Sequence, residues 1–268
     1  MEPLYVSLSF YVSVFILAEI TRRVIETLTG PGTLSRRFAY ELIATAQMCT
    51  CVYENALIIK YYGLIGFFTV VVVLLIVGSY VNRGAFVSPL ASIEAVYFGR
   101  ISIRDFVALF LAELAGGYMA FRWARLIWSA GVSHDHTAFY DNFYCKLGYK
   151  VPYVQAAVFE VVGCFLIRYI IGAAPLATKR FVAAITAAGF LTFALRFIGV
   201  PGLNPIVASS RMQGCEGLSI DWFLFTYWIC PIIGSLAAAI YQSRGQAPAV
   251  KKTPAAVKKS AAAVKKTN

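Results

Sequence analysis

Seven stretches of the sequence are long and apolar enough to cross a membrane. An apolar helix needs about 20 residues to span the ~30 Å hydrocarbon layer, and such stretches lie at 4–20, 38–59, 63–81, 105–121, 153–173, 181–200 and 220–241. Hydrophobic residues make up 59% of the chain and charged residues 14%, against about 45–50% and about 25% in soluble domains. A chain of this composition cannot cover its apolar surface in water. We therefore predict an integral membrane protein and exclude a soluble enzyme.

The positions of lysine and arginine indicate how these segments cross. Basic residues near the ends of spans favour the cytosolic side. The connections 21–37, 82–104 and 174–180 are rich in them, whereas 130–152 is poor and 201–219 is close to neutral. This alternation predicts seven spans, with a lumenal or extracellular N-terminus and a cytosolic C-terminus. We interpret the first apolar segment as a helix that is retained and not as a cleaved signal peptide. In the alternative, this helix lies along the membrane interface and only six helices cross.

Two connections have the pattern of half-helices rather than loops. Ser88-Pro89 and Asn204-Pro205 each place a small polar residue before a proline, which is typical of an N-cap followed by the first helical residue. About ten residues of helix rise ~15 Å, half the thickness of a membrane. Broken segments at that depth are tolerated only where they line a cavity or are buried in protein.

The two halves of the chain repeat one pattern. Glu41 opens a unit over 38–121 and Glu160 opens a unit over 153–241, and in each a helix, a helix, a half-helix and a helix follow in order. Because each unit has an odd number of spans, the two copies must cross in opposite orientations. This is an inverted repeat, whose site is expected at the membrane midplane.

These features resemble the aquaporin family over residues 38–241. The second box reads Asn204-Pro205-Ile206, and the last helix carries the stretch from Trp228 to Ser235, which resembles the sixth helix of the family. The first box departs from the usual Asn-Pro-Ala and reads Ser88-Pro89-Leu90. The deviant boxes, the extra N-terminal helix and the stretch 41–54 resemble the superaquaporin, or aquaporin-11-like, branch. The resemblance implies an all-α membrane protein with two re-entrant half-helices, assembled as a homotetramer in the bilayer.

Facing half-helices give the two boxes an electrostatic role. Two helix N-termini that meet aim their positive dipole ends at the pore centre, which disfavours cations. The Asn204 carboxamide is suited to cap its helix and to present an N–H to a solute oxygen, whereas Ser88 offers a hydroxyl of shorter reach. The alternative is that both residues are only caps in loops.

The resemblance also places a constriction at Phe68, Thr192, Pro201 and Val207. In the family an arginine stands three positions after the second asparagine, where this chain has Val207. Valine in place of this arginine removes a positive charge and a hydrogen-bond donor from the constriction. This argues against a pore that passes water alone and favours small neutral solutes such as glycerol or hydrogen peroxide. Arg196 is a candidate for a substitute charge, although pairing with an acid or facing the interface is the preferred interpretation.

Three acidic residues within apolar segments are candidates for functional or structural roles, because charges are costly in a membrane. Family precedent assigns Glu41 and Glu160 to accepting hydrogen bonds from the backbone of the broken segments, and Glu113 is expected to act similarly. That role is scaffolding. The alternative is a proton relay in a proton-coupled transporter.

The cysteine and histidine residues suggest structure rather than metal chemistry. His134-Asp135-His136 is expected to be a solvated polar loop, since no second cluster completes a zinc site. Cys145 and Cys215 fall on the non-cytosolic side in the topology above, where disulfides are permitted, and superaquaporins carry cysteines in the same two loops, which implies a bridge. The other four cysteines are expected to be small apolar fillers, and no cofactor or metal is expected.

We divide the chain into three parts: an extra helix and its connection over 1–37, a channel domain over 38–241, and a lysine-rich tail over 242–268. Seven of the basic residues lie from Arg244 onward, and the rest of the chain carries only +4 of the net +11. The tail is low in complexity, so we expect disorder. It is expected to attract anionic lipid, and Lys265 and Lys266 resemble a dilysine retrieval signal. An endoplasmic reticulum membrane is therefore favoured over the plasma membrane or another membrane.

The function predicted from the sequence is a passive channel for water or small neutral solutes, with no enzymatic activity and no nucleic-acid partner. Its main competitor is a structural or interaction protein with a blocked pore, because Leu90 and Ile206 are bulkier than alanine. A third hypothesis is a proton-coupled transporter built around the three carboxylates.

Overall fold

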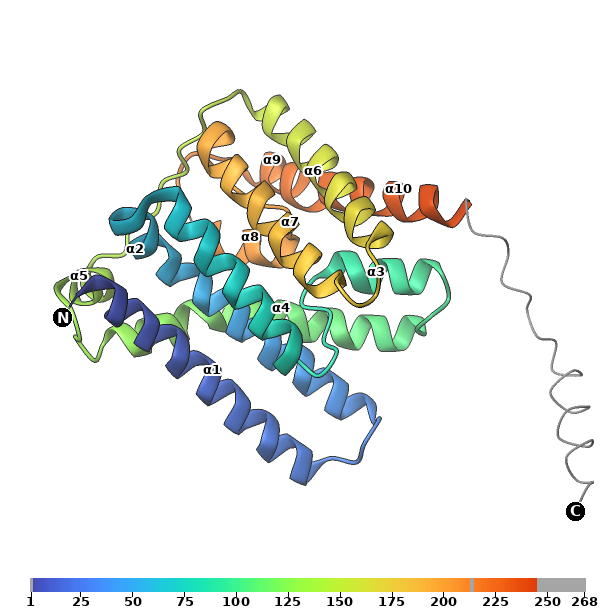
Figure 1. Cartoon of the computed structure of the whole chain (residues 1–268), viewed down its shortest axis with the longest axis horizontal. Helices are drawn as coiled ribbons and strands as arrows, with labels where there is room; N and C mark the ends of the chain where they lie inside the picture. Colours follow the sequence, from blue (N-terminus) through green and yellow to red (C-terminus); the bar gives the residue numbers. More distant parts are fainter. Residues whose placement is uncertain (1, 213–214, 245–268) are drawn as a thin grey trace, which may run out of the picture.

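Long helices that lie side by side along one direction make up most of the molecule (Figure 1). The computed structural model describes residues 2–212 and 215–244. Its α-helices are α1 (Pro3–Leu28), α2 (Leu34–Val81), α3 (Pro89–Tyr97), α4 (Ile103–Trp128), α5 (His134–Asp141), α6 (Tyr153–Ala173), α7 (Lys179–Phe193), α8 (Pro205–Met212), α9 (Ile220–Leu224) and α10 (Cys230–Arg244). Two π-helical segments, η1 (Ala194–Ile198) and η2 (Phe225–Ile229), continue α7 and α9. The all-helical fold class expected from the sequence is confirmed.

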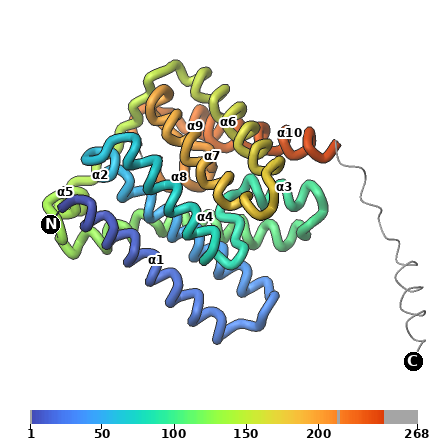
Figure 2. Tube along the Cα trace, viewed as in Figure 1, coloured from blue at the N-terminus to red at the C-terminus, as the bar shows by residue number. Residues whose placement is uncertain are grey.

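Helix α2 supplies two membrane crossings from one element. Its 48 residues would rise about 72 Å as one straight helix at 1.5 Å per residue, more than twice the hydrocarbon thickness. Gly63 breaks the helix with φ 62° and ψ −160°, a conformation that is accessible to glycine. The second limb folds back beside the first (Figure 2), so that the side-chain amide of Gln47 lies 3.5 Å from the Asn82 oxygen. The six membrane-length apolar helices of the described residues therefore provide seven crossing segments.

The extra helix α1 packs antiparallel to the first limb of α2. Near its start the Ser7 hydroxyl donates to the Glu54 carboxylate (2.7 Å), and near its end the Arg22 guanidinium donates to Gln47 (2.6 Å). Because these contacts fall near the two ends of α1, the helix stays beside α2 over most of its length. Apolar side chains on its outer face are exposed, among them Tyr5, Leu8, Val12, Ile16 and Ile20. This geometry favours a seventh span over a helix lying at the interface.

The two repeats are built around matching close crossings. In the first, α4 meets α2 at Gly116, where an added Cβ would lie 2.6 Å from the Leu42 carbonyl oxygen. In the second, α10 meets α6 at Gly234, where a Cβ would lie 2.1 Å from the Val161 oxygen. Glycine permits this approach because it has no side chain. The half-helices α3 and α8 fill the space that the crossings leave between the repeats.

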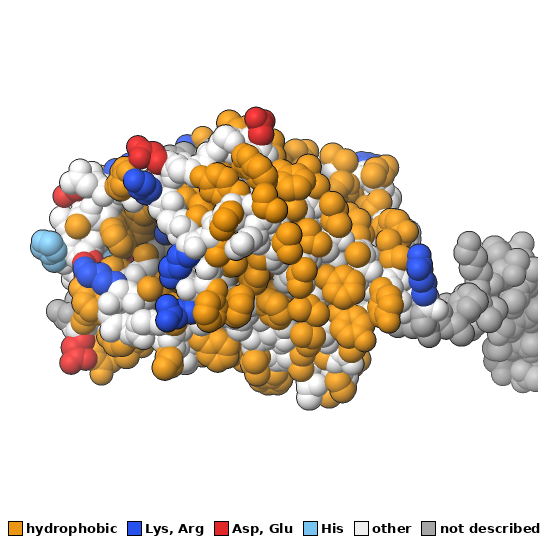
Figure 3. Space-filling model, turned by 90° about the horizontal axis from the view of Figure 1, so that it is seen from above, with side chains coloured by type: hydrophobic (Ala, Val, Ile, Leu, Met, Phe, Trp, Pro, Cys, Tyr) orange, Lys and Arg blue, Asp and Glu red, His pale blue; other side chains and the backbone are white. Residues whose placement is uncertain are grey.

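The outer surface suits a lipid environment. On the face drawn in Figure 3, apolar side chains form a broad surface and most charged side chains gather toward one end. Helix α1 begins at one end of the bundle and α10 ends at the other (Figure 1), which fits an odd number of crossings. These observations establish a multi-pass membrane protein.

The crossing at Gly234 yields a stability prediction. Replacing Gly234 with Ala forces a methyl group against the Val161 backbone, and overpacking of this kind costs about 1–3 kcal/mol. We expect a lower midpoint of thermal unfolding in detergent, measured by intrinsic fluorescence. Gly189→Ala in α7 is the matched control, since an added Cβ there meets nothing within 4 Å. Equal midpoints for the two variants would contradict this account of the crossing.

Candidate pore

Each half-helix begins with the cap and proline that the sequence indicates. The Ser88 hydroxyl accepts a hydrogen bond from the Leu90 N–H (3.4 Å), and Pro89 follows as the first residue of α3. In α8 the Asn204 side-chain oxygen accepts from the Ile206 N–H at 3.0 Å. These bonds satisfy N–H groups that have no partner within their own helices.

Asn204 also joins the two half-helices. Its side-chain N–H donates to the Val87 carbonyl at 3.0 Å, and Val87 directly precedes the cap of α3. The N-termini of α3 and α8 therefore meet in the middle of the bundle, where their positive dipole ends reinforce each other. An asparagine amide has two N–H groups, and this bond uses one of them.

Two buried carboxylates hold the bends that precede the half-helices. Val87 and Leu203 adopt left-handed conformations, with φ of 58° and 60°, at a cost of order 1–3 kcal/mol each for residues other than glycine. Glu41 accepts from the N–H groups of Val87 and Phe86, the latter at 2.9 Å. Glu160 accepts from the Leu203 N–H at 2.7 Å. The two repeats thus use the same device at equivalent positions.

Glu113 is placed differently from this pair. It is fully buried in α4, beside the Glu41 carboxyl group and the Ser88 backbone. Within the described part of the chain its carboxyl oxygens make no hydrogen bond. The backbone-holding role implied for Glu113 stays a prediction.

A cavity of about 1440 Å³ passes the two boxes. Ser88 and Asn204 line its middle, together with apolar walls that include Val71 and Leu191. We call one end the disulfide mouth, lined by Cys145, Lys146 and Arg211, and the other end the Glu94 mouth, lined by Glu94, Arg100, Arg168, Lys179 and Arg180. Six of the charged residues along this cavity are basic and one is acidic, so its electrostatic potential is positive.

Two of the four expected constriction residues line this cavity. Pro201 and Val207 do so, whereas Phe68 and Thr192 are not among the residues that line it. The Thr192 hydroxyl is turned back onto the Ala188 carbonyl of its own helix (2.7 Å), and the neighbours Phe67 and Leu191 line the cavity instead. Adjacent helical residues point about 100° apart, so a shift of one position in counting across helices changes which side chain faces the pore.

The two bulky box residues have different surroundings. Leu90 lines the cavity. Ile206 is 1% exposed and packs in the core, where its Cγ2 atom would lie 2.8 Å from a Cβ added to Gly117 of α4. Only Leu90 narrows the passage, which weakens the argument for a blocked pore.

Arg211 is a pore residue that the sequence analysis missed. Arg196, the candidate for a substitute charge, is exposed and does not line the cavity. Arg211 lines it at the disulfide mouth. The sequence spacing could have predicted this position, because Arg211 follows Val207 by four residues and therefore lies on the same face of α8.

The segment His134–His136 is not the solvated loop that was expected. It begins the short helix α5, and His136 is buried with Nε2 at 3.1 and 3.2 Å from the two Glu54 oxygens. Trp128 donates to the same carboxylate at 3.2 Å. Outside the spans, hydrogen bonds from Lys60 and Tyr61 lower the pKa of the Asp135 carboxyl group. No group of three metal-ligating side chains occurs within residues 2–212 and 215–244.

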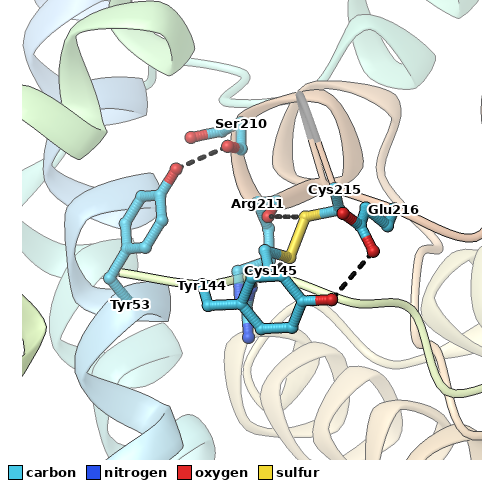
Figure 4. Close-up of a disulfide and its surroundings, with 7 residues drawn as sticks. All are labelled: Tyr53, Tyr144, Cys145, Ser210, Arg211, Cys215 and Glu216. Atoms are coloured by element: carbon cyan, nitrogen blue, oxygen red, sulfur yellow. Dashed lines mark hydrogen bonds between the residues drawn. A yellow bond between two sulfur atoms is a disulfide. The ribbon is translucent and has the colours of Figure 1, made fainter. Parts of the chain in front are cut away.

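A disulfide lies at one mouth of the cavity. Cys145 and Cys215 are bonded, with Cα atoms 4.7 Å apart (Figure 4). The other cysteines, Cys49, Cys51, Cys164 and Cys230, are buried free thiols. Lys265 and Lys266 of the suggested retrieval signal, and the tail from residue 245 on, lie outside the described residues.

Comparisons with known proteins identify relatives over most of the chain. No protein-family model matches it. The chain is 40% identical over 242 residues to a putative aquaporin-10 of Caenorhabditis elegans, covering 88% of this chain and 86% of the relative. It is 26% identical over 241 residues to human aquaporin-11, with 86% of each covered. The X-ray structure of the aquaglyceroporin from Plasmodium falciparum has the same fold, with a TM-score of 0.58 and 14% identity over 79% of this chain and 96% of that chain.

The carboxylate at Glu160 yields a second prediction. Glu160→Ala leaves the buried Leu203 N–H without an acceptor, which costs about 1–3 kcal/mol. Glu160→Gln retains an acceptor oxygen, so we expect it to unfold at a temperature between those of the alanine variant and the wild type. Thermal unfolding in detergent measures the order. If the alanine variant were as stable as the wild type, the carboxylate would not hold the bend.

Proposed function

This chain belongs to the aquaporin family, and from that premise we propose that it forms a passive channel for water and small neutral solutes rather than acting as an enzyme. One observation carries the proposal: a single cavity extends past both half-helix N-termini and reaches residues at each end of the bundle. A channel needs such a path, and the family fold supplies it.

The lining explains how a neutral solute would pass. Apolar walls offer it little hydrogen bonding, so it sheds water and exchanges bonds with the few polar groups at the midplane. Those groups are the Ser88 hydroxyl, the second N–H of Asn204 and exposed carbonyl groups. Cations are opposed by the paired helix dipoles and by the basic mouths. No energy source is needed, because the solute follows its own gradient.

The solute class follows from the residue at the constriction. Val207 lines the cavity where the family has an arginine, and a valine leaves a less polar throat. This supports solutes such as glycerol and hydrogen peroxide in addition to water. The aquaglyceroporin fold neighbour is compatible with this assignment.

Two competing functions each rest on one feature. A non-conducting structural protein is favoured by Leu90, whose side chain lines the passage. A proton-coupled transporter would use the buried carboxylates, but Glu41 and Glu160 are committed to backbone N–H groups. That commitment supports scaffolding, and it leaves Glu113 as the one carboxylate of the three without a hydrogen bond in the described structure.

Assembly and location complete the proposal. Family resemblance supports a homotetramer with one pore per protomer. The resemblance of Lys265-Lys266 to a dilysine signal supports residence in the endoplasmic reticulum membrane, and the loop charges support a cytosolic tail.

Flux through the purified protein in liposomes tests the function. Stopped-flow light scattering should show faster entry of water or glycerol than in empty liposomes, and an enclosed peroxide-sensitive dye should report hydrogen peroxide. Rates equal to those of empty liposomes for all three solutes would favour the non-conducting protein. Uptake that requires a proton gradient would favour the transporter.

Asn204 gives a sharper test within the same assay. Asn204→Ala loses the cap, at a cost of about 0.5–2 kcal/mol, and loses the bond to Val87. Asn204→Asp keeps a good cap but places a carboxylate at the paired dipole ends. We expect the aspartate variant to fold better than the alanine variant and yet to lose neutral-solute flux or to leak cations. If Asn204→Asp conducted neutral solutes at the wild-type rate and did not leak cations, the role of Asn204 would be limited to capping α8.

The sidedness of the termini is a separate prediction. Epitope tags at both ends, tested by protease digestion of sealed microsomes, should show a digested C-terminal tag and a protected N-terminal tag. If both tags were digested, the number of crossings would be even and α1 would not span.

A further inference from the structure

Arg211 projects from the same face of α8 as the constriction residue Val207. The two residues are four positions apart, so they are separated by about one turn and about 6 Å along the helix. Both line the cavity, and Arg211 lies nearer the disulfide mouth. The chain thus lacks a charge at the level of Val207 and carries one a turn further from the boxes.

Contacts from α2 and from the two disulfide-bonded cysteines fix this part of α8. The Tyr53 hydroxyl of α2 donates to the Ser210 carbonyl (Figure 4). The Arg211 side chain places Nη1 3.6 Å from the Cys145 Sγ atom, and the Cys215 Sγ atom lies 3.5 Å from the Arg211 carbonyl oxygen. The disulfide therefore contacts both the backbone and the guanidinium of this residue.

Arg211 also forms the wall between the cavity and a side pocket. This pocket has a volume of about 550 Å³ and is lined by residues that include Tyr118, Arg122 and Glu216. Glu216 lines this side pocket together with Arg211, but it accepts a hydrogen bond from the Tyr144 hydroxyl at 2.8 Å and does not line the channel cavity. The ion pairs within the described residues do not include Arg211. Among the residues that the structure describes, no acidic side chain is paired with its guanidinium.

We propose that Arg211 is the charge-selecting residue of the disulfide mouth, and that the Cys145–Cys215 disulfide positions it there. A guanidinium without an ion-pair partner in the described residues, set in a cavity with largely apolar walls, repels cations and offers N–H donors to neutral or anionic solutes. Lys146 adds a second positive charge at the same mouth. This inference rests on the proposed channel function and specifies how that channel discriminates by charge.

The test compares Arg211→Gln, Arg211→Lys and wild type in liposomes loaded with a sodium-sensitive dye, with glycerol flux measured in parallel. Arg122→Gln is the matched control, because it removes an arginine that lines only the side pocket and bonds to Tyr118. We expect Na⁺ entry about tenfold faster in Arg211→Gln, and entry at the wild-type rate in Arg211→Lys and Arg122→Gln.

The possible results separate a failure of the Arg211 inference from a failure of the channel function. If Arg211→Gln conducts glycerol and excludes Na⁺ like the wild type, the inference fails while the channel function stands. If the wild type conducts no solute, both fail. A leak of equal size in Arg122→Gln would mean that charge at this face, rather than Arg211, excludes cations.

Reduction of the disulfide tests the positioning role without a substitution that endangers folding. Treating wild-type liposomes with a membrane-impermeant phosphine should raise Na⁺ entry toward that of Arg211→Gln, and it should change Arg211→Gln no further. Unchanged Na⁺ exclusion in reduced wild type, with loss of the disulfide verified by mass spectrometry, would overturn the positioning role.

Discussion

The bonds between two buried carboxylates and the backbone of the broken segments support the rest of this structure. Glu41 and Glu160 accept the N–H groups of Val87 and Leu203, which adopt left-handed conformations that are unfavourable by themselves. Without these acceptors the bends would leave polar groups unpaired at membrane depth. Because the bends are held, two half-helices point their N-termini at one place, and the cavity passes between them.

The electrostatics of the cavity follow from that arrangement. Paired helix N-termini at the centre and six basic residues along the lining give a positive potential, and the one acid, Glu94, is bonded to Arg100 and Arg168. Such a lining opposes cations from either side. The apolar stretches between the mouths and the boxes penalise any ion that must lose its water. Neutral solutes meet neither obstacle, which is the physical basis of the proposed selectivity.

Two sets of contacts tie the segments around the repeats to the bundle. Helix α1 is bonded to α2 through Ser7 and Glu54 at one end and through Arg22 and Gln47 at the other. The Glu54 carboxylate also accepts a hydrogen bond from the Trp128 indole N–H and contacts the His136 ring. One buried acid therefore joins α1, α2, α4 and α5. The disulfide fastens the segment before α6 to the segment after α8. Both sets of contacts join segments that are far apart in the sequence.

The sequence by itself determined the membrane class, the inverted repeat and the two capped half-helices, because length, hydropathy and the cap-proline pattern are local properties. It also marked Glu41 and Glu160, since charge within an apolar segment is rare. Only the tertiary structure decided which neighbours face the cavity: Phe67 rather than Phe68, Leu191 rather than Thr192, and Arg211 in addition to Val207. Helix rotation and packing set those choices, and they depend on contacts between segments far apart in the chain.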